Sequence, residues 1–266
     1  MPTESSTLSF HCALVTGGGG GIGKAIAKYF ISQGKKVIIA GRTESTLRET
    51  AKEIGAADYY VLDTGVVGTF PDFVSRITSE HPELDCLVNN AGVQRPLDLV
   101  DEDKVEDVLG RADQEIDINV RGVMHLTLGL LGHFKKKEGG AVVMNVSSVL
   151  GFVPFAVVNP VYCGTKAWVH FWTMNLRTQL RKAGLGRIRV VEIAPPTVET
   201  DLHREREDPD DNKKEKNPSA LSLEEFMQEV AGMLERGEEV IAPGMSGELV
   251  RGWYEQFGGV YDKITA

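Results

Sequence analysis

Seven short apolar runs alternate with segments of helical period, and this alternation restricts the fold of the 266-residue chain more than any other feature. The runs are rich in β-branched residues and are bounded by turn residues, as strands buried on both faces of a sheet are. They cover residues 12–16, 37–40, 59–62, 84–88, 141–146, 188–193 and 240–241. Because parallel neighbours need a crossover connection, we expect an α/β fold with a doubly wound parallel sheet of about seven strands and helices on both faces.

Length and composition favour one domain spanning residues 1–266. Apolar residues make up 42% of the chain, which is ordinary for a packed globular protein. With a net charge of −9, the chain is poorly suited to bind the phosphate backbone of a nucleic acid, so we expect no nucleic-acid partner. The longest apolar stretch, residues 141–158, is interrupted by polar residues, glycine and proline, so we expect no membrane span.

Residues 1–9 are polar and lack the basic and apolar regions of a signal peptide, which favours a cytoplasmic protein. Cys12, Cys86 and Cys163 lie far apart in apolar runs and show no metal-ligand spacing. The histidines show none either, and we expect no metal site. The cysteines are interpreted as small buried hydrophobic residues.

Five consecutive glycines, residues 17–21, separate the first apolar run from the first helical segment. Glycines let the backbone turn tightly and approach a ligand closely. The helix that begins near Gly21 offers free N–H groups and the positive end of its dipole. A glycine run placed between strand and helix predicts a pyrophosphate site and a Rossmann-like dinucleotide fold. A flexible glycine turn without a ligand is the alternative.

Arg42 follows the second predicted strand, at the place where folds that choose NAD carry a carboxylate for the ribose 2′-hydroxyl. A guanidinium suits a 2′-phosphate, whereas a carboxylate would repel it. We therefore expect NADP(H) to be preferred over NAD(H). The alternative is that Arg42 only stacks on the adenine.

Tyr162 and Lys166 lie four residues apart in a predicted helix and so share one face. Asn159 and Pro160 predict the start of this helix as N-cap and first helical residue, and Gly184 predicts its end. Apolar residues occur on several sides of the helix. Either a partner subunit or a thick local core must cover them.

The window of residues 201–216 is almost entirely charged. A solvated, mobile loop is the favoured interpretation. Its place directly after the sixth strand also suits a substrate lid, spanning about residues 201–222.

These motifs, in this order and spacing, resemble the short-chain dehydrogenase/reductase family over nearly the whole chain. Within the family, the chain is most similar to the oxidoreductases named after the D-alanyl-lipoteichoic acid operon, through Pro160-Val161-Tyr162 and Ala194-Pro195-Pro196. That subgroup name establishes no substrate. The matching pieces are Thr16-Gly17-x-x-x-Gly21-Ile22-Gly23, Asp63-Thr64, Asn89-Asn90-Ala91-Gly92, Asn119, Ser148, Tyr162-x-x-x-Lys166 and residues 195–200.

The resemblance implies an acid–base site. Tyr162 would give a proton to a carbonyl oxygen or take one from an alcohol, and Lys166, with the nicotinamide's positive charge, would lower the pKa of the phenol. Lys166 would also hold the nicotinamide ribose. Ser148 would bond the substrate oxygen as charge develops. Asn119 would anchor a water that relays protons to Lys166. The predicted catalytic residues are therefore Asn119, Ser148, Tyr162 and Lys166.

The resemblance also implies a set of cofactor contacts. Asp63 would accept a hydrogen bond from the adenine amino group, and Val198 and Thr200 would orient the nicotinamide carboxamide. With Arg42 included, the predicted cofactor-binding residues are Gly17, Gly21, Ile22, Gly23, Arg42, Asp63, Thr64, Asn90, Ala91, Gly92, Tyr162, Lys166, Pro195, Val198 and Thr200.

The chain departs from the family pattern at two places. Pro196 stands where the family usually has glycine, so the local turn must differ because proline fixes φ and lacks an N–H. One extra residue separates Ser148 from Tyr162, which we expect to lengthen the loop of residues 151–159. Val153, Pro154 and Phe155 of that loop are expected to form an apolar wall of the substrate pocket. Gln94, Arg95 and the lid would form others.

The sequence thus predicts an NADP(H)-dependent oxidoreductase for a small-molecule carbonyl or secondary alcohol. An apolar pocket favours a hydrophobic substrate, while Arg95 or His203 would suit an acidic one. The resemblance further implies a homodimer or homotetramer. The alternatives are an NADP-binding redox sensor without turnover and an epimerase or dehydratase that uses the same tyrosine.

Overall fold

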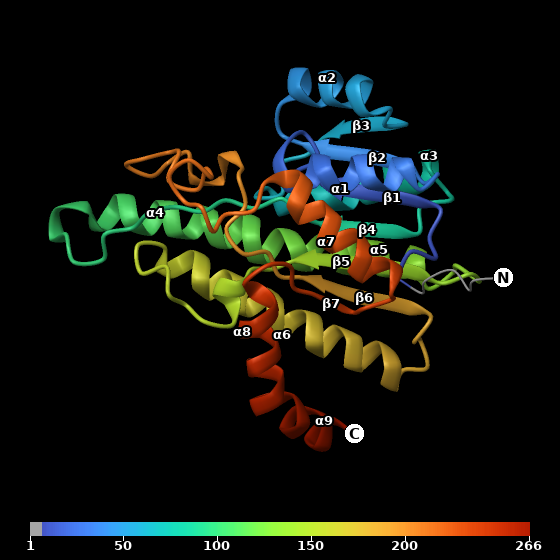
Figure 1. Cartoon of the computed structure of the whole chain (residues 1–266). Helices are drawn as coiled ribbons and strands as arrows, with labels where there is room; N and C mark the ends of the chain where they lie inside the picture. Colours follow the sequence, from blue (N-terminus) through green and yellow to red (C-terminus); the bar gives the residue numbers. More distant parts are fainter. Residues whose placement is uncertain (1–6) are drawn as a thin grey trace.

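The computed structural model describes residues 7–266 and contains the predicted seven-stranded parallel sheet. The expectation of a polar start without a signal peptide falls mainly on residues outside this range. The sheet has the order β3-β2-β1-β4-β5-β6-β7 (Figure 1). The strands are β1 (Cys12–Thr16), β2 (Lys36–Gly41), β3 (Asp58–Val61), β4 (Cys86–Asn89), β5 (Ala141–Val146), β6 (Ile188–Ile193) and β7 (Val240–Ile241).

Helices cover both faces of the sheet, so the predicted doubly wound architecture is confirmed. One face is packed by α1 (Gly21–Ser32), α2 (Glu44–Ile54) and α7 (Leu223–Glu235). The other is packed by α3 (Phe70–Glu80), α5 (Gly122–Phe134) and α6 (Pro160–Lys182). The remaining helices are α4 (Val105–Ile116), α8 (Ser246–Trp253) and α9 (Gly259–Thr265).

Successive residues of each inner strand enter opposite halves of the core. In β1, Val15 packs with the α1 side and Leu14 with the α5 side. Side chains alternate along a strand, so a strand covered on both faces must be apolar at nearly every position. This requirement produced the continuous apolar runs in the sequence. The three cysteines are buried and unpaired, as expected for small hydrophobic residues.

The chain order reverses between β1 and β4, because the chain first builds β1 to β3 in one direction and then β4 to β7 in the other. Parallel sheets of this kind open a crevice at the carboxyl ends of the strands beside such a switch point. The glycine run, Arg42 and the residues after β4, β5 and β6 all follow strands at this edge.

A continuous helical segment runs from α4 through a π-helical turn, η3 (Asp117–Arg121), into α5. α4 projects beyond the sheet on the same side as the loop of residues 201–222 (Figure 1). π-turns widen the helix locally and frequently occur at functional sites. Asn119 lies in this turn.

α6 begins at Pro160 as predicted, but the predicted cap is wrong in one respect. Asn159 makes no side-chain capping bond; its Oδ1 accepts a hydrogen bond from Arg206 at 2.6 Å instead. The C-terminal segment supplies part of the cover that the helix needs, since Trp253 packs edge-on against His170. Phe171 remains 49% exposed.

Candidate active site

A cavity of about 790 Å³ opens at the carboxyl edge of the sheet. Its wall is formed by the segments that follow β1, β2, β4, β5 and β6, together with the start of α6 and the loop after β6. Most of the predicted site residues meet here. Those that line the cavity are Gly17, Gly21, Ile22, Arg42, Asn90, Ala91, Gly92, Ser148, Tyr162, Lys166, Pro195, Val198 and Thr200.

The glycine run fits a bound pyrophosphate. Gly17 has a φ of +65°, and a Cβ there would lie 2.8 Å from Asn90 Nδ2. A Cβ on Gly20 would meet nothing within 4 Å, so the backbone borders open space at the first turn of α1. Side chains are thus excluded where the backbone packs on itself, and the helix N-terminus faces the cavity.

Arg42 stands at the carboxyl end of β2, is exposed and lines the cavity. Thr43 and Thr46 line it as well and were not predicted, although they lie only one and four residues after Arg42 in the chain. On the opposite wall, Asn90 is fixed by a 2.9 Å bond from its Nδ2 to the carbonyl of Thr16. This end of the cavity therefore offers a guanidinium, two hydroxyls and glycine backbone to a nucleotide.

The other end of the cavity holds the predicted acid–base group. Ser148 caps a short 3₁₀ turn after β5, and its hydroxyl hydrogen-bonds the Tyr162 phenol. The Lys166 ammonium lies 5.5 Å from the centre of the Tyr162 ring and donates to the Val146 carbonyl at 2.8 Å. All three side chains are buried. The structure thus brings Ser148, Tyr162 and Lys166 together.

The chain's own groups shift the pKa values of Tyr162 and Lys166 in opposite directions. Burial raises the pKa of Tyr162, the Glu115 carboxylate raises it further, and the Ser148 hydrogen bond and Arg206 lower it. Burial lowers the pKa of Lys166 to about 8, against the effect of Glu115. Among the chain's own groups, desolvation of the phenolate therefore outweighs the interactions that lower the pKa of Tyr162. The expected lowering includes the charge of the nicotinamide and stays a prediction. A protonated phenol is the form that can act as an acid.

Asn119 lies behind the cavity wall rather than in it. Its Nδ2 donates to the Val93 carbonyl at 2.9 Å and to Thr165 Oγ1 at 3.1 Å, and its Oδ1 accepts from the Val93 amide. A Cβ on Gly92 would lie 3.2 Å from Asn119 Oδ1 and 3.7 Å from Lys166 Nζ. Gly92 therefore keeps open the space between the amide oxygen and the ammonium.

Three predicted cofactor residues do not line the cavity. A Cβ on Gly23 would lie 2.3 Å from the Gly17 carbonyl, so Gly23 serves helix–strand packing. Asp63 is exposed and accepts a hydrogen bond from the Gly65 amide. A Cβ on Gly122 would lie 2.6 Å from the Thr64 carbonyl. The backbone of Thr64, which follows β3, therefore packs closely against the start of α5.

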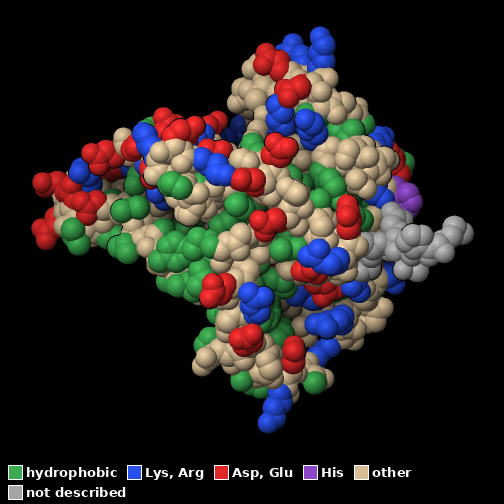
Figure 2. Space-filling view, in the orientation of Figure 1, with side chains coloured by type: hydrophobic (Ala, Val, Ile, Leu, Met, Phe, Trp, Pro, Cys, Tyr) green, Lys and Arg blue, Asp and Glu red, His purple; other side chains and the backbone are tan. Residues whose placement is uncertain are grey.

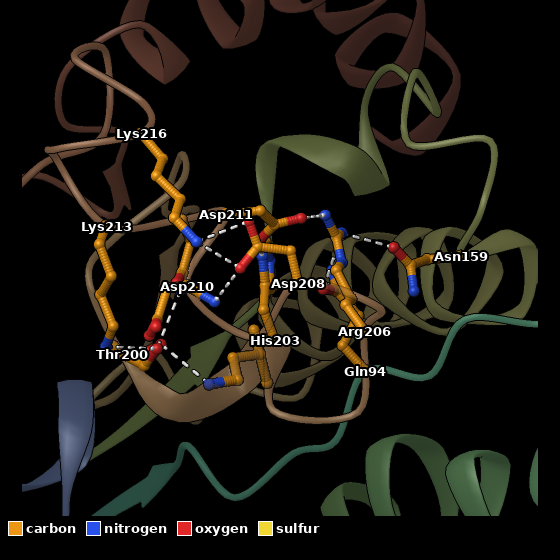
Figure 3. Close-up of polar contacts among 12 residues, drawn as sticks. Gln94, Asn159, Thr200, His203, Arg206, Asp208, Asp210, Asp211, Lys213 and Lys216 are labelled. Atoms are coloured by element: carbon orange, nitrogen blue, oxygen red, sulfur yellow. Dashed lines mark hydrogen bonds and ion pairs between the residues drawn. The ribbon is translucent and has the colours of Figure 1, made fainter.

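The loop of residues 201–222 contributes to the cavity wall and is tied to the body of the protein. Arg206 donates to Asn159 Oδ1 at 2.6 Å and to Gln94 Oε1 at 3.1 Å, and it pairs with Asp211 at 2.7 Å (Figure 3). His203 bonds the other oxygen of Asp211. We call these contacts of Arg206 with Gln94 and Asn159 the clasp. The sequence missed it, because nothing in a run of charge marks one arginine as the residue that bonds distant segments.

The predicted apolar wall is only partly correct. Phe155 lines the cavity, as does Gln94, but Val153 lines a separate shallow groove beside α8 and Pro154 lines neither. Arg95 lies outside the cavity wall and contacts Glu205 at 3.5 Å. His203 does line the cavity.

Within residues 7–266, no cluster of three or more histidine, cysteine or acidic side chains is placed to hold a metal ion. Over the same residues, none of the helices combines the length and the apolar character that a membrane span requires.

Known proteins are similar to this chain in sequence and in fold. The family model described as short chain dehydrogenase matches residues 11–211. DltE of Bacillus subtilis (strain 168), an uncharacterized oxidoreductase, is 33% identical over 254 residues, which cover 96% of this chain and 94% of that protein.

Two further relatives carry a named activity. The NADP-dependent 3-hydroxy acid dehydrogenase YdfG of Escherichia coli (strain K12) is 34% identical over 222 residues, covering 82% of this chain and 86% of that protein. The closed form of serine dehydrogenase complexed with NADP⁺ superimposes with a TM-score of 0.71 at 32% identity, covering 84% of this chain and 88% of that one.

Proposed function

Because the chain belongs to the short-chain dehydrogenase family and is an oxidoreductase acting on CH–OH or C=O groups, we propose that it reduces a carbonyl, or oxidises a secondary alcohol, by direct hydride transfer with Tyr162 as general acid or base. The expected resemblance to this family and to the DltE-type oxidoreductases is confirmed. One observation carries the proposal: Ser148, Tyr162 and Lys166 converge at one end of the cavity whose other end is built for a nucleotide.

The residues divide the chemistry as follows. The Tyr162 hydroxyl protonates the substrate oxygen, and Ser148 donates a hydrogen bond to the same oxygen as negative charge develops there. Lys166 places a positive charge near the phenol and binds the nicotinamide ribose of the cofactor. Asn119 lies beside the open space at Gly92, where a relay water would reach Lys166. NADPH supplies the hydride when bound.

The cofactor preference is proposed from Arg42. A guanidinium at the end of β2 suits the 2′-phosphate of NADP(H), and the neighbouring hydroxyls of Thr43 and Thr46 add donors. The fit of the dinucleotide rests on this chain's own glycine cradle and on the first turn of α1. The NADP-linked relatives support the same cofactor.

The loop of residues 201–222 is proposed to be the substrate lid. It contributes Leu202, His203 and Arg206 to the cavity wall, and the clasp joins it to the two segments that flank the catalytic end. The apolar contribution comes from Val149, Leu150 and Phe155. We propose a small molecule that combines an apolar body with a carbonyl or secondary hydroxyl group.

A panel of ketones, aldehydes and hydroxy acids, assayed by NADPH absorbance, tests this function. The proposal predicts turnover of at least one carbonyl class with NADPH, and oxidation of the matching alcohol with NADP⁺. Cofactor binding without turnover across a broad panel would favour the sensor over the enzyme.

A further inference from the structure

Glu115 is a buried carboxyl group that the reaction described above does not use. Its exposed fraction is zero, and the backbone of Arg95 is its one hydrogen-bonding neighbour among the described residues, at the margin of hydrogen-bond geometry. Burying a carboxylate with so little compensation costs several kcal/mol, so such a group needs a reason to be there.

The helix that carries Glu115 is inverted relative to the ordinary pattern. Glu115 is the buried residue of α4, whereas Val105, Leu109 and Ile116 are exposed. Within one chain, α4 thus buries a carboxyl group and leaves apolar side chains at the surface. Glu115 also precedes the π-turn that carries Asn119, so the same helical segment brings both side chains toward the catalytic end.

Charged groups of three other segments act electrostatically on the Glu115 carboxyl group. They are Arg95 in the segment after β4, Lys166 on α6 and Glu205 in the loop after β6. Arg95 is engaged elsewhere, because it contacts Glu205 and donates to the Arg111 carbonyl at 3.4 Å. Arg111, on the same helix as Glu115, also bonds Glu205, at 3.1 Å. Lys166 has one hydrogen-bonded partner, the Val146 carbonyl.

Electrostatic coupling follows from this arrangement. Burial raises the pKa of Glu115 to about 7, while Arg95 and Lys166 lower it and Glu205 raises it. In return, Glu115 raises the pKa of both Lys166 and Tyr162. The charge states of Glu115 and Lys166 therefore act on each other, and that of Glu115 also acts on Tyr162.

We propose that Glu115 is a positioning residue of the active site: a buried counter-charge that keeps Lys166 protonated and so sets the pH range in which Tyr162 can give up its proton. The proposal rests on the function given above for Tyr162 and Lys166. It adds that the charge state of a residue outside the cavity governs theirs.

The first test measures Lys166 directly and needs no substrate. The ¹³C NMR signal of Lys166 Cε, assigned by its loss in Lys166→Arg, is titrated in protein with labelled lysine. We expect Glu115→Gln to lower the pKa of Lys166 by about one pH unit, because the opposite charge is removed. Glu115→Asp, which retains the charge, should shift it by less than half as much. Glu106→Gln, on the exposed face of the same helix, is the matched control and should shift nothing.

The second test measures turnover. In Glu115→Gln the basic limb of the pH profile of kcat/KM for carbonyl reduction should move to lower pH by the same amount, with NADPH affinity unchanged. A folded Glu115→Gln protein whose Lys166 titration and basic limb both coincide with wild type overturns the inference. If the panel shows no turnover but Lys166 still shifts, it is the proposed function that fails, and not the coupling.

Folding provides a third readout. Since the folded-state pKa of Glu115 is raised, its contribution to stability is present at acid pH and is lost as the pH rises through about 7. The Tm of wild type should therefore fall relative to Glu115→Gln between pH 5 and pH 8. Parallel Tm curves would show that Glu115 does not titrate as this account requires.

Discussion

At the scale of single residues, burial determines the direction of the pKa shifts of Tyr162 and Lys166. Tyr162 and Lys166 are both buried, and desolvation favours the neutral form of each side chain. It therefore raises the pKa of Tyr162 and lowers the pKa of Lys166. The spacing in the sequence predicted which two side chains meet, because four residues make one helical turn. It did not predict the effect of burial on the pKa of Tyr162, which depends on enclosure by segments far away in the chain. Glu115 escaped prediction for the same reason.

The proposed cofactor preference depends on Arg42. We expect Arg42→Asp to raise the KM for NADPH by about 10- to 100-fold, since a charge-assisted contact is replaced by repulsion, while the KM for NADH changes little. Arg48→Asp, an exposed arginine on α2, is the control. Steady-state kinetics with both cofactors measure the effect. Equal KM values for the two cofactors in the wild type would contradict the assignment.

At the scale of elements, the strands and the first helix follow directly from the sequence, because strands buried on both faces must be apolar throughout. The loop of residues 201–222 does not. Its composition predicts a solvated segment, yet Arg206 crosses to Gln94 and Asn159, which lie far away in the chain. A contact between residues so distant in sequence leaves no local pattern, and the same is true of the role of Asn159.

The clasp gives a prediction for this element. Arg206→Ala should free the loop, raise the KM for the substrate about tenfold or more and speed tryptic cleavage at Lys213 and Lys214, since three charge-assisted contacts are lost. Lys216→Ala removes only a surface ion pair with Asp208 and serves as the control. Unchanged cleavage and an unchanged KM in Arg206→Ala would show that the clasp does not hold the loop.

At the scale of the whole molecule, the surface indicates where a second subunit would bind. Exposed apolar side chains occur on α4, α5 and α6, among them Leu109, Leu128 and Phe171. Hydrophobic side chains also form a band between α4 and the start of α6 (Figure 2). Phe155 and Val157, in the loop before α6, are exposed as well. The sequence predicted an apolar surplus on α6 without showing which residues would stay uncovered, because that depends on where the C-terminal segment packs.

We expect the protein to form a homodimer or homotetramer in which the helices that carry Asn119 and Tyr162 pair across a two-fold axis. Sedimentation equilibrium should give two or four times the mass of one chain, and Phe171→Glu should weaken the association by placing a charge in the interface. Val66→Glu, at an exposed apolar residue near α3, should not. A monomeric wild type at micromolar concentration would count against this arrangement.

The central claim is that the buried phenol of Tyr162, with Ser148 and Lys166 beside it, transfers the proton that accompanies hydride transfer. Tyr162→Phe tests it most directly, with NADPH affinity measured by calorimetry and turnover measured on the best carbonyl of the panel. The account predicts a dissociation constant within a few-fold of wild type and a loss of turnover on the order of a thousandfold or more. Turnover that persists at the wild-type rate in Tyr162→Phe would contradict it.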